Sequence, residues 1–220
     1  MSEYVIPEVP MRVLHEEDAF VVVEKASGFL SVPGRGLEKL DSVAHRVRET
    51  YPGCIEHPAV QRLDMDTSGI LVVARTAEAH RALSIQFQER QTEKRYCAIL
   101  DGEQEGEQAG TIELPFRLDI ENRPYQIYDE VHGKVGITHW EREGIREGRT
   151  RIWFRPVTGR THQLRVHAAH GKGLGIPIVG DPLYGSGTGP GELRLHACWL
   201  RFRHPEGGGP MEFESLPGWW

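Results

Sequence analysis

The chain has 220 residues, of which 39% are hydrophobic and 26% are charged, so it can bury a substantial core and does not have the composition of a disordered protein. No stretch approaches the roughly 18 uninterrupted apolar residues of a membrane span, and no basic start precedes an apolar run. The three cysteines, Cys54, Cys97 and Cys198, fit neither a disulfide framework nor a paired zinc knuckle. We therefore expect a soluble, cytoplasmic protein with reduced thiols and no membrane contact.

Charge is unevenly distributed along the chain. The formal net charge of −6 at pH 7 argues weakly against a nucleic-acid partner, because phosphate binding draws on Lys and Arg. However, residues 142–172 hold eight Lys and Arg against Glu143 and Glu147, whereas residues 101–113 are acidic and lack both basic types. An acidic protein of this kind can present one basic face. The alternative is a merely solvated charged surface.

The first third of the chain predicts an irregular arm, a strand and a short helix. Residues 1–11 are polar and carry two prolines, which is typical of an arm without regular structure. A buried strand is predicted around Phe20–Val23, followed by a loop with several Gly and Pro residues. The segment "DSVAHRVRETYPG" predicts a helix capped by Asp41 and ended by Pro-Gly.

The remaining chain predicts more strands than helices. "GILVVAR" reads as a strand, and "TAEAHRALSIQFQER" as a helix capped by Thr76 with apolar side chains at fourfold spacing. "KRYCAIL", residues 135–141 and 151–154, and "LHACWLRF" are further predicted strands. Residues 101–110 predict a hairpin or loop, and "TGRTHQLRVHAAHGKG" predicts a helix from near Thr161 to Gly171.

These elements favour an α+β fold. Strands outnumber helices and do not alternate with them regularly, so we expect a mixed, mostly antiparallel sheet flanked by helices and loops. No internal repeat or low-complexity linker divides the chain. Residues 12–220 are therefore predicted to form one domain.

Four stretches contain more polar and glycine residues than folding alone requires: 25–36, 61–69, 94–96 and 158–170. Asp64 comes directly before a predicted strand, where a rigid scaffold can hold a functional group. A carboxylate in a turn with Thr, Ser and Gly can cap that turn, or it can act as a catalytic acid, base or nucleophile. Both interpretations remain open from the residues alone.

A guanidinium and a phenol are the other candidate groups. Arg165 has the planar fork that pairs with a carboxylate, and such a pair would keep Asp64 ionised and aimed. The alternatives for Arg165 are a phosphate contact and a surface charge. Arg160 and His162 lie nearer the start of the predicted helix, where phosphates bind. Tyr96 could stack on a base or simply pack in its sheet.

Four motifs of the chain resemble those of a known protein family. They resemble the successive motifs of the RluA family of RNA pseudouridine synthases, in the family's order and at its spacing. The four motifs are "RLDMDTSG", "KRYCAIL", "PVTGRTHQLRVH" and "PIVGDPLYG". The resemblance extends from about Val13 to Phe213. It implies a pseudouridine synthase fold with a central catalytic cleft, no cofactor and no metal.

The resemblance also implies roles for residues. Asp64 would be the essential catalytic aspartate, Tyr96 would contact the target base, and Arg165 would form an ion pair with Asp64. Arg62 would support or replace the flipped nucleotide. Further RNA contacts are expected from three residues, namely Lys94, Arg160 and His162.

The implied partner is structured RNA, namely a stem-loop of large-subunit ribosomal RNA, a transfer RNA anticodon stem-loop, or both. A monomer is expected. Two residues depart from the family pattern: Gln61 stands where the family usually has His, and Ala26 follows Lys25 where it usually has Pro. The second change removes a fixed φ and is expected to loosen its loop.

Two alternatives and two mechanisms stay open. A metal-dependent hydrolase could use a set of possible ligands, namely His162, His167, His170, Asp181 and His196, although no His-Glu-x-x-His signature occurs. A non-catalytic RNA-binding module is the other alternative. If the protein isomerises uridine, Asp64 can attack C1′ as a nucleophile or remove the C2′ proton as a base.

Overall fold

The computed structural model describes residues 11–220, so the predicted arm at residues 1–11 lies outside this range except for Met11. The chain divides into two compact units. The N-terminal unit comprises the residues up to Lys94 together with His196–Gly218 and Trp220. The central unit comprises Arg95–Leu195 and Trp219.

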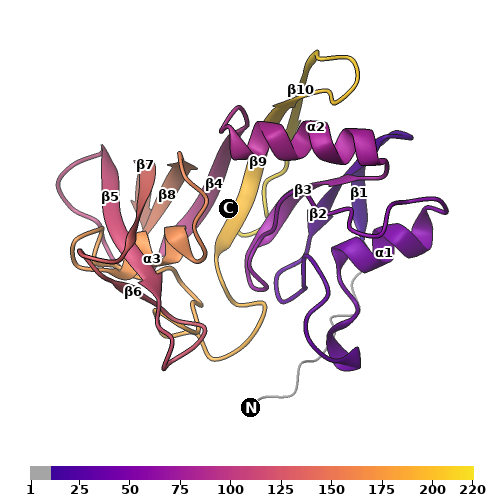
Figure 1. Ribbon diagram of the computed structural model, residues 1–220. Helices are drawn as coiled ribbons and strands as arrows, with labels where there is room; N and C mark the ends of the chain where they lie inside the picture. Colours follow the sequence, from indigo (N-terminus) through magenta and orange to yellow (C-terminus); the bar gives the residue numbers. More distant parts are fainter. Residues whose placement is uncertain (1–10) are drawn as a thin grey trace. The chain divides into compact units, whose positions relative to one another are not determined.

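Ten strands and three α-helices lie within the described range (Figure 1). The strands are β1 (Arg12–Glu16), β2 (Phe20–Lys25), β3 (Ser68–Ala74), β4 (Glu93–Leu100), β5 (Ala109–Leu118), β6 (Gln126–Tyr128), β7 (Lys134–Arg146), β8 (Arg149–Pro156), β9 (Leu195–Arg203) and β10 (Pro210–Glu214). The helices are α1 (Val43–Thr50), α2 (Ala77–Gln88) and α3 (Gln163–Ala169), with a 3-10 turn η1 (Leu37–Lys39).

The sheet of the N-terminal unit is mixed. Its strands follow the order β1-β2-β3-β9-β10, and every neighbouring pair is antiparallel except β3 with β9. That parallel pairing is short and joins Ser68 and Gly69 to His196 and Ala197. The first residues of β3, which directly follow the Asp64 turn, are therefore fixed by a strand from the far end of the chain.

Two helices accompany this sheet. Thr76 is the N-cap of α2, as predicted, and its side chain accepts a hydrogen bond from the Ala79 N–H. The buried Ala79 and Leu83 of α2 pack against side chains of β2, β3 and β9. Ser42 is the N-cap of α1, and its hydroxyl accepts a hydrogen bond from the His45 N–H. The predicted cap at Asp41 is wrong, because that carboxylate forms a two-bond pair with Arg46 instead.

The sheet of the central unit is antiparallel throughout, with the order β4-β8-β7-β5-β6. α3 packs against β7 (Figure 1) and contributes Leu164, Val166 and Ala168 to a core shared with side chains of β4, β5, β7 and β8. Alternate residues of these strands face α3, which is why the apolar positions of β5 and β8 recur with period two. The predicted α+β class with a mostly antiparallel mixed sheet is confirmed.

The sequence located most elements but missed four strands, β1, β5, β6 and β10. β5 follows the acidic run and contains Pro115, and both features disfavour a strand in a single sequence. The third helix is shorter than predicted, because His162 takes a left-handed backbone conformation (φ 56°) and His170 an extended one.

The expected separation of charge is incomplete. β4 and β8 pair antiparallel with Leu100 opposite Thr150, which brings Arg149 to 3.2 Å from Asp101 of the acidic run. Two more arginines of residues 142–172, Arg146 and Arg155, have glutamate partners on β7. This segment is therefore not one uninterrupted basic face.

No α-helix in residues 11–220 combines the length and apolar character needed to cross a membrane.

Candidate functional site

The Asp64 turn is closed by its own backbone. The Thr67 N–H donates to the carbonyl oxygen of Asp64 at 3.1 Å, and β3 begins at the next residue, Ser68. Asp66 and Thr67 are buried, whereas Asp64 is half-buried. The turn therefore presents one partly accessible carboxylate directly before a buried strand.

The side chain of Lys25, the last residue of β2, is hydrogen-bonded to this turn. Its side chain is only 1% exposed, and its Nζ donates to the carbonyls of Met65 (2.7 Å), Phe29 (2.6 Å) and Ala26 (2.9 Å). One ammonium thus joins the loop that follows β2 to the residue next to Asp64. Three N–H groups meeting three carbonyls is the arrangement that a buried lysine requires.

Two serines of the same loop add to this link. Ser27 Oγ donates to the carbonyl of Asp66, and Ser31 Oγ donates to the carbonyl of Leu63 at 2.7 Å while accepting from its N–H at 3.0 Å. The backbone from Leu63 to Asp66 is therefore bonded to side chains of residues 25–31 on both sides of Asp64. The change from Pro to Ala at position 26 does not leave this loop unattached.

The electrostatic environment of Lys25 is mixed. Burial lowers its pKa to about 7, and the negative charges of Asp66 and Asp64 act in the opposite direction. The two carboxylates thus favour the ammonium form, which is the form that has three N–H groups for the three carbonyls.

The start of β3 is fixed from the other side by His196 of β9. Ser68 Oγ lies 2.9 Å from His196 Nδ1, and His196 Nε2 lies 3.1 Å from the carbonyl oxygen of Ser215. Because only an N–H can bond that carbonyl, Nδ1 is the acceptor for the Ser68 hydroxyl. Gly69 has φ 120°, and a Cβ there would lie 2.4 Å from the Ala197 carbonyl oxygen, so no larger residue fits.

In the central unit, Arg165 of α3 is held by a partner that the sequence did not suggest. Its Nε donates to Asp181 Oδ2 at 2.9 Å and its Nη2 to Asp181 Oδ1 at 2.6 Å. The two side chains are 2% and 0% exposed. A buried guanidinium paired through two parallel hydrogen bonds has a fixed direction as well as a compensated charge.

The surroundings of His162 place its ring inside the protein. The residue is 9% exposed, and its Nδ1 lies 2.9 Å from the hydroxyl of Tyr184, which also accepts from the Gln126 N–H at 2.8 Å. The start of α3 is occupied by the Gln163 side chain, whose Oε1 accepts from the Arg160 N–H and from Thr158 Oγ1. The N–H of Gln163, the first residue of α3, is also bonded, to the Arg160 carbonyl at 3.1 Å, so the predicted phosphate site has fewer open N–H groups than expected.

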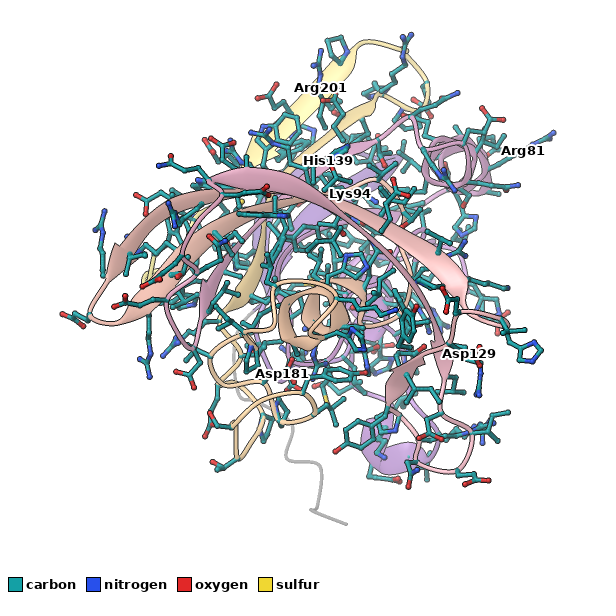
Figure 2. The ribbon with its side chains drawn as sticks, turned by 90° about the vertical axis from the view of Figure 1, so that its left-hand side faces the viewer. Arg81, Lys94, Asp129, His139, Asp181 and Arg201 are labelled. Atoms are coloured by element: carbon teal, nitrogen blue, oxygen red, sulfur yellow. The ribbon has the colours of Figure 1, made fainter. Side chains whose placement is uncertain are left out.

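The other predicted contact residues lie on different elements. Tyr96 of β4 is half-buried and packs against the core of the central unit. Lys94, labelled in Figure 2, lies with its Nζ 6.0 Å from the centre of the Phe87 ring, and burial lowers its pKa. Arg62 and Arg160 are exposed.

The predicted residues are divided between the two units. Asp64, Arg62 and Lys94 belong to the N-terminal unit. Tyr96 and Arg165, together with Arg160 and His162, belong to the central unit. The meeting of Asp64 with Tyr96 and Arg165 stays a prediction.

Sequence reasoning missed the residues that hold the site. The sequence identifies Lys25, Ser27 and Ser31 only as members of a polar loop, and Asp181 only as part of a motif and as a possible metal ligand. The run "KASGFLS", with polar side chains directly after a buried strand, was the available signal. At Gln61, one of the two departures from the family pattern, the side-chain nitrogen is buried and has no hydrogen-bond partner in the described range.

The alternative metal site does not gain support from the geometry. Both oxygens of Asp181 are bonded to Arg165, and the His170 ring stacks on Tyr128. Residues 11–220 contain no group of three His, Cys, Asp or Glu side chains arranged to hold a metal ion.

His167 of α3 is a buried titratable residue that takes no part in the hydrogen bonds around Asp64 and Arg165. It is 0% exposed, its ring meets Phe116 edge-on, and neither ring nitrogen has a hydrogen-bond partner within the described residues. Burial lowers its pKa from the usual 6.5 to about 4. It is therefore neutral in the folded protein at neutral pH.

Comparison with known proteins gives one consistent result. The family model described as RNA pseudouridylate synthase matches residues 19–170. The Dual-specificity RNA pseudouridine synthase RluA of Escherichia coli K12 is 40% identical over 98% of this chain and 97% of its own length. The protein of the same name from Vibrio vulnificus is 44% identical over 94% of this chain and 83% of its own length.

Solved structures agree on the fold. Human RNA Pseudouridylate Synthase Domain Containing 1 matches with a TM-score of 0.76 and 28% identity, covering 98% of this chain and 88% of that one. Human RNA Pseudouridylate Synthase Domain Containing 4 has a TM-score of 0.70 at 21% identity, over 94% and 89% of the two chains, and supports the fold alone.

Replacing Lys25 tests the hydrogen bonds that join the loop after β2 to the Asp64 turn. Lys25→Met keeps an unbranched side chain but leaves three buried carbonyls without this donor, so we expect the free energy of unfolding to fall by about 2–4 kcal/mol. Urea denaturation measures it. The exposed Lys39→Met should change stability by less than about 0.5 kcal/mol. Equal stability of the Lys25 variant and the wild type would contradict the linking role.

A second prediction concerns pH. The folded pKa of His167 lies below its unfolded value, so the unfolded state binds more protons between pH 6.5 and 4, and stability is lost as pH falls through this window. The contribution is about 3 kcal/mol between pH 7.5 and 4. His167→Leu should lose about this much less stability over that range in urea denaturation. Parallel pH profiles for the variant and the wild type would show that His167 does not titrate in this way.

Proposed function

The chain belongs to the RNA pseudouridylate synthase family, and from this premise we propose that Asp64, Tyr96 and Arg165 together isomerise uridine to pseudouridine in RNA. The two units would then form one catalytic domain, with Asp64 supplied by the N-terminal unit and the other two residues by the central unit. The observation that carries the proposal is that Asp64 and Arg165 are each held in place by hydrogen bonds. Asp64 lies in a turn bonded to residues 25–31, and Arg165 is fixed by Asp181.

The reaction rearranges one nucleotide without a second substrate. The N1–C1′ bond breaks, the uracil turns within the site, and C5 joins C1′, after which the proton on C5 is lost and N1 gains one. The proposed role of Asp64 is to attack C1′ as a nucleophile or to remove the C2′ proton as a base. In both cases the carboxylate must be ionised and aimed, which suits a turn whose backbone is bonded on both sides.

Arg165 is proposed to orient the Asp64 carboxylate. Asp181 engages its Nε and Nη2, and a guanidinium has a second edge that includes Nη1. We assign Asp64 to this second edge. One arginine would then lie between two carboxylates, fixed by the buried one and directing the reactive one.

The target base has to leave the RNA stack before Asp64 can reach its sugar. Flipping a uridine costs a few kcal/mol, which RNA backbone contacts offset. Tyr96 would stack on the uracil through its ring, which serves in both orientations of the base. Arg62 is exposed beside the turn and would fill the vacated space.

The remaining predicted RNA contacts fit to different degrees. Arg160 is exposed, and Lys94 offers an ammonium over an aromatic ring, so both are proposed to contact phosphates. His162 is better suited to a role inside the protein, because its buried ring is bonded to the hydroxyl of Tyr184.

The RNA itself is proposed from the relatives. They are named dual-specificity synthases, and we propose that this protein likewise acts on more than one RNA, such as a stem-loop of large-subunit ribosomal RNA and a transfer RNA anticodon stem-loop. It would act as a monomer in the cytoplasm, a compartment in which its three free cysteines stay reduced. Mapping pseudouridines in RNA from cells with and without the gene identifies the target.

Asp64→Asn separates catalysis from binding. The amide keeps the size of the side chain but is neither a nucleophile nor a base, so we expect turnover to fall by about 10³-fold or more, with RNA affinity within about threefold of the wild type. Tritium release from RNA labelled at uridine C5 measures turnover, and filter binding measures affinity. The exposed Asp18→Asn is the matched control and should remain fully active.

Substantial tritium release by Asp64→Asn would remove Asp64 from its proposed role. A wild-type protein that binds RNA but releases no tritium would support the non-catalytic module instead.

A further inference from the structure

No residue of the segment Gly180–Gly185, "GDPLYG", is proposed to touch the substrate, although Asp181 of this segment binds Arg165. We propose that two of its residues, Asp181 and Tyr184, are positioning residues that hold Arg165 in the orientation from which it directs Asp64. This inference rests on the proposed function and deepens it. It concerns residues that act through Arg165 and do not touch the substrate.

The first support is the geometry of the pair. Asp181 follows α3 in the chain and lies beside it (Figure 2), and its two oxygens accept from Arg165 Nε and Nη2 at 2.9 and 2.6 Å. Two parallel bonds fix the plane of the guanidinium as well as its position. With both side chains fully buried, Arg165 cannot turn toward solvent.

The second support is that Asp181 is itself immobilised. Its Oδ1 also accepts from the backbone N–H groups of Leu183 (2.9 Å) and Tyr184 (3.0 Å). The turn around it is tightly packed: a Cβ at Gly180 would lie 2.1 Å from the Glu192 carbonyl oxygen, and one at Gly187 would lie 2.3 Å from the Gly180 carbonyl oxygen. The carboxylate therefore has four donors and one orientation.

The third support is Tyr184, which bounds the guanidinium with an aromatic face. The centre of its ring lies 5.4 Å from Arg165 Cζ, within the range of a cation–π contact. Its hydroxyl is fixed by Gln126 and His162, so the ring cannot swing away without breaking both contacts. Arg165 is thus constrained at one edge by Asp181 and lies over the face of the Tyr184 ring.

The charge of Asp181 fits this role. Burial raises its pKa, but the hydrogen bonds and positive charge of Arg165 outweigh that effect, and the net pKa is below the usual value. A carboxylate that stays ionised keeps both bonds to Arg165 throughout the neutral pH range. Were it neutral, one of its oxygens would carry a proton facing a guanidinium N–H.

A double-mutant cycle separates positioning from a merely structural pair. The four proteins are the wild type, Asp181→Asn, Arg165→Met and the double variant, with Tyr184→Phe as a milder fifth. Each is assayed for the single-turnover rate of tritium release, for RNA affinity and for melting temperature. Asp41→Asn is the control, because Asp41 forms the same two-bond pair with Arg46 (2.9 and 2.7 Å) in the N-terminal unit.

If Asp181 acts through Arg165, Asp181→Asn should slow the wild type by about 100-fold but slow Arg165→Met by less than about twofold, because a residue cannot misplace a side chain that is absent. RNA affinity should stay within about threefold. Tyr184→Phe keeps the ring but loses its hydroxyl contacts and should slow the reaction by about tenfold. Asp41→Asn should release tritium at the wild-type rate.

Equal losses from Asp181→Asn in both backgrounds, or full activity of Asp181→Asn and Tyr184→Phe, would overturn the inference. If Asp181→Asn does not fold, Tyr184→Phe alone and in the Arg165→Met background carries the same test, with the same outcome required. A wild-type protein that releases no tritium overturns the proposed function and this inference with it, whereas an active wild type with an additive cycle overturns the inference alone.

Discussion

A cation removed from water must be surrounded by acceptors, and this constraint shapes both parts of the proposed site. Lys25 satisfies it with three backbone carbonyls, and Arg165 satisfies it with both oxygens of Asp181. In each case the compensation has a structural effect. The carbonyls that bind Lys25 belong to two separate loops, so the ammonium fastens the Asp64 turn, and the two-bond pair with Asp181 fixes the direction of Arg165. Loss of either cation would free a segment that the chemistry needs in one place.

Under the proposed function, this arrangement would let side chains far apart in the sequence act on one nucleotide. Catalysis by a positioned carboxylate depends on little reorganisation during the reaction, so the supporting contacts matter as much as the reactive group. Ser27 and Ser31 restrain the backbone on both sides of Asp64, while His196 restrains Ser68 at the start of β3. The residues that we propose as reactive therefore lie on segments held by hydrogen bonds, and in the proposed reaction the motion would come from the substrate, which flips its base.

How far the sequence predicts this molecule depends on whether a feature is local. The cap at Thr76 and the apolar runs of β2 and β3 are set by neighbouring residues, and these predictions are confirmed. The sequence also points to Asp64 and Arg165 as candidates, because the motifs that contain them are specific. Arg165 and its partner Asp181 are 16 positions apart, and Lys25 and its partner Met65 are 40 positions apart. The periodicity of apolar residues in a sequence does not predict contacts at such separations. β5 was missed for a similar reason, since its place between β6 and β7 outweighs the local effect of Pro115.

The central claim is that an acid, a phenol and a guanidinium surround one everted uridine. A crystal structure of the protein bound to a stem-loop RNA with 5-fluorouridine at the modified position tests it most directly. The account predicts an Asp64 oxygen about 3 Å from an Arg165 nitrogen and facing C1′ of the flipped sugar, with the Tyr96 ring stacked on the base. A flipped nucleotide that contacts neither Asp64 nor Tyr96, with Arg165 bonded to Asp181 and no second carboxylate, would contradict it.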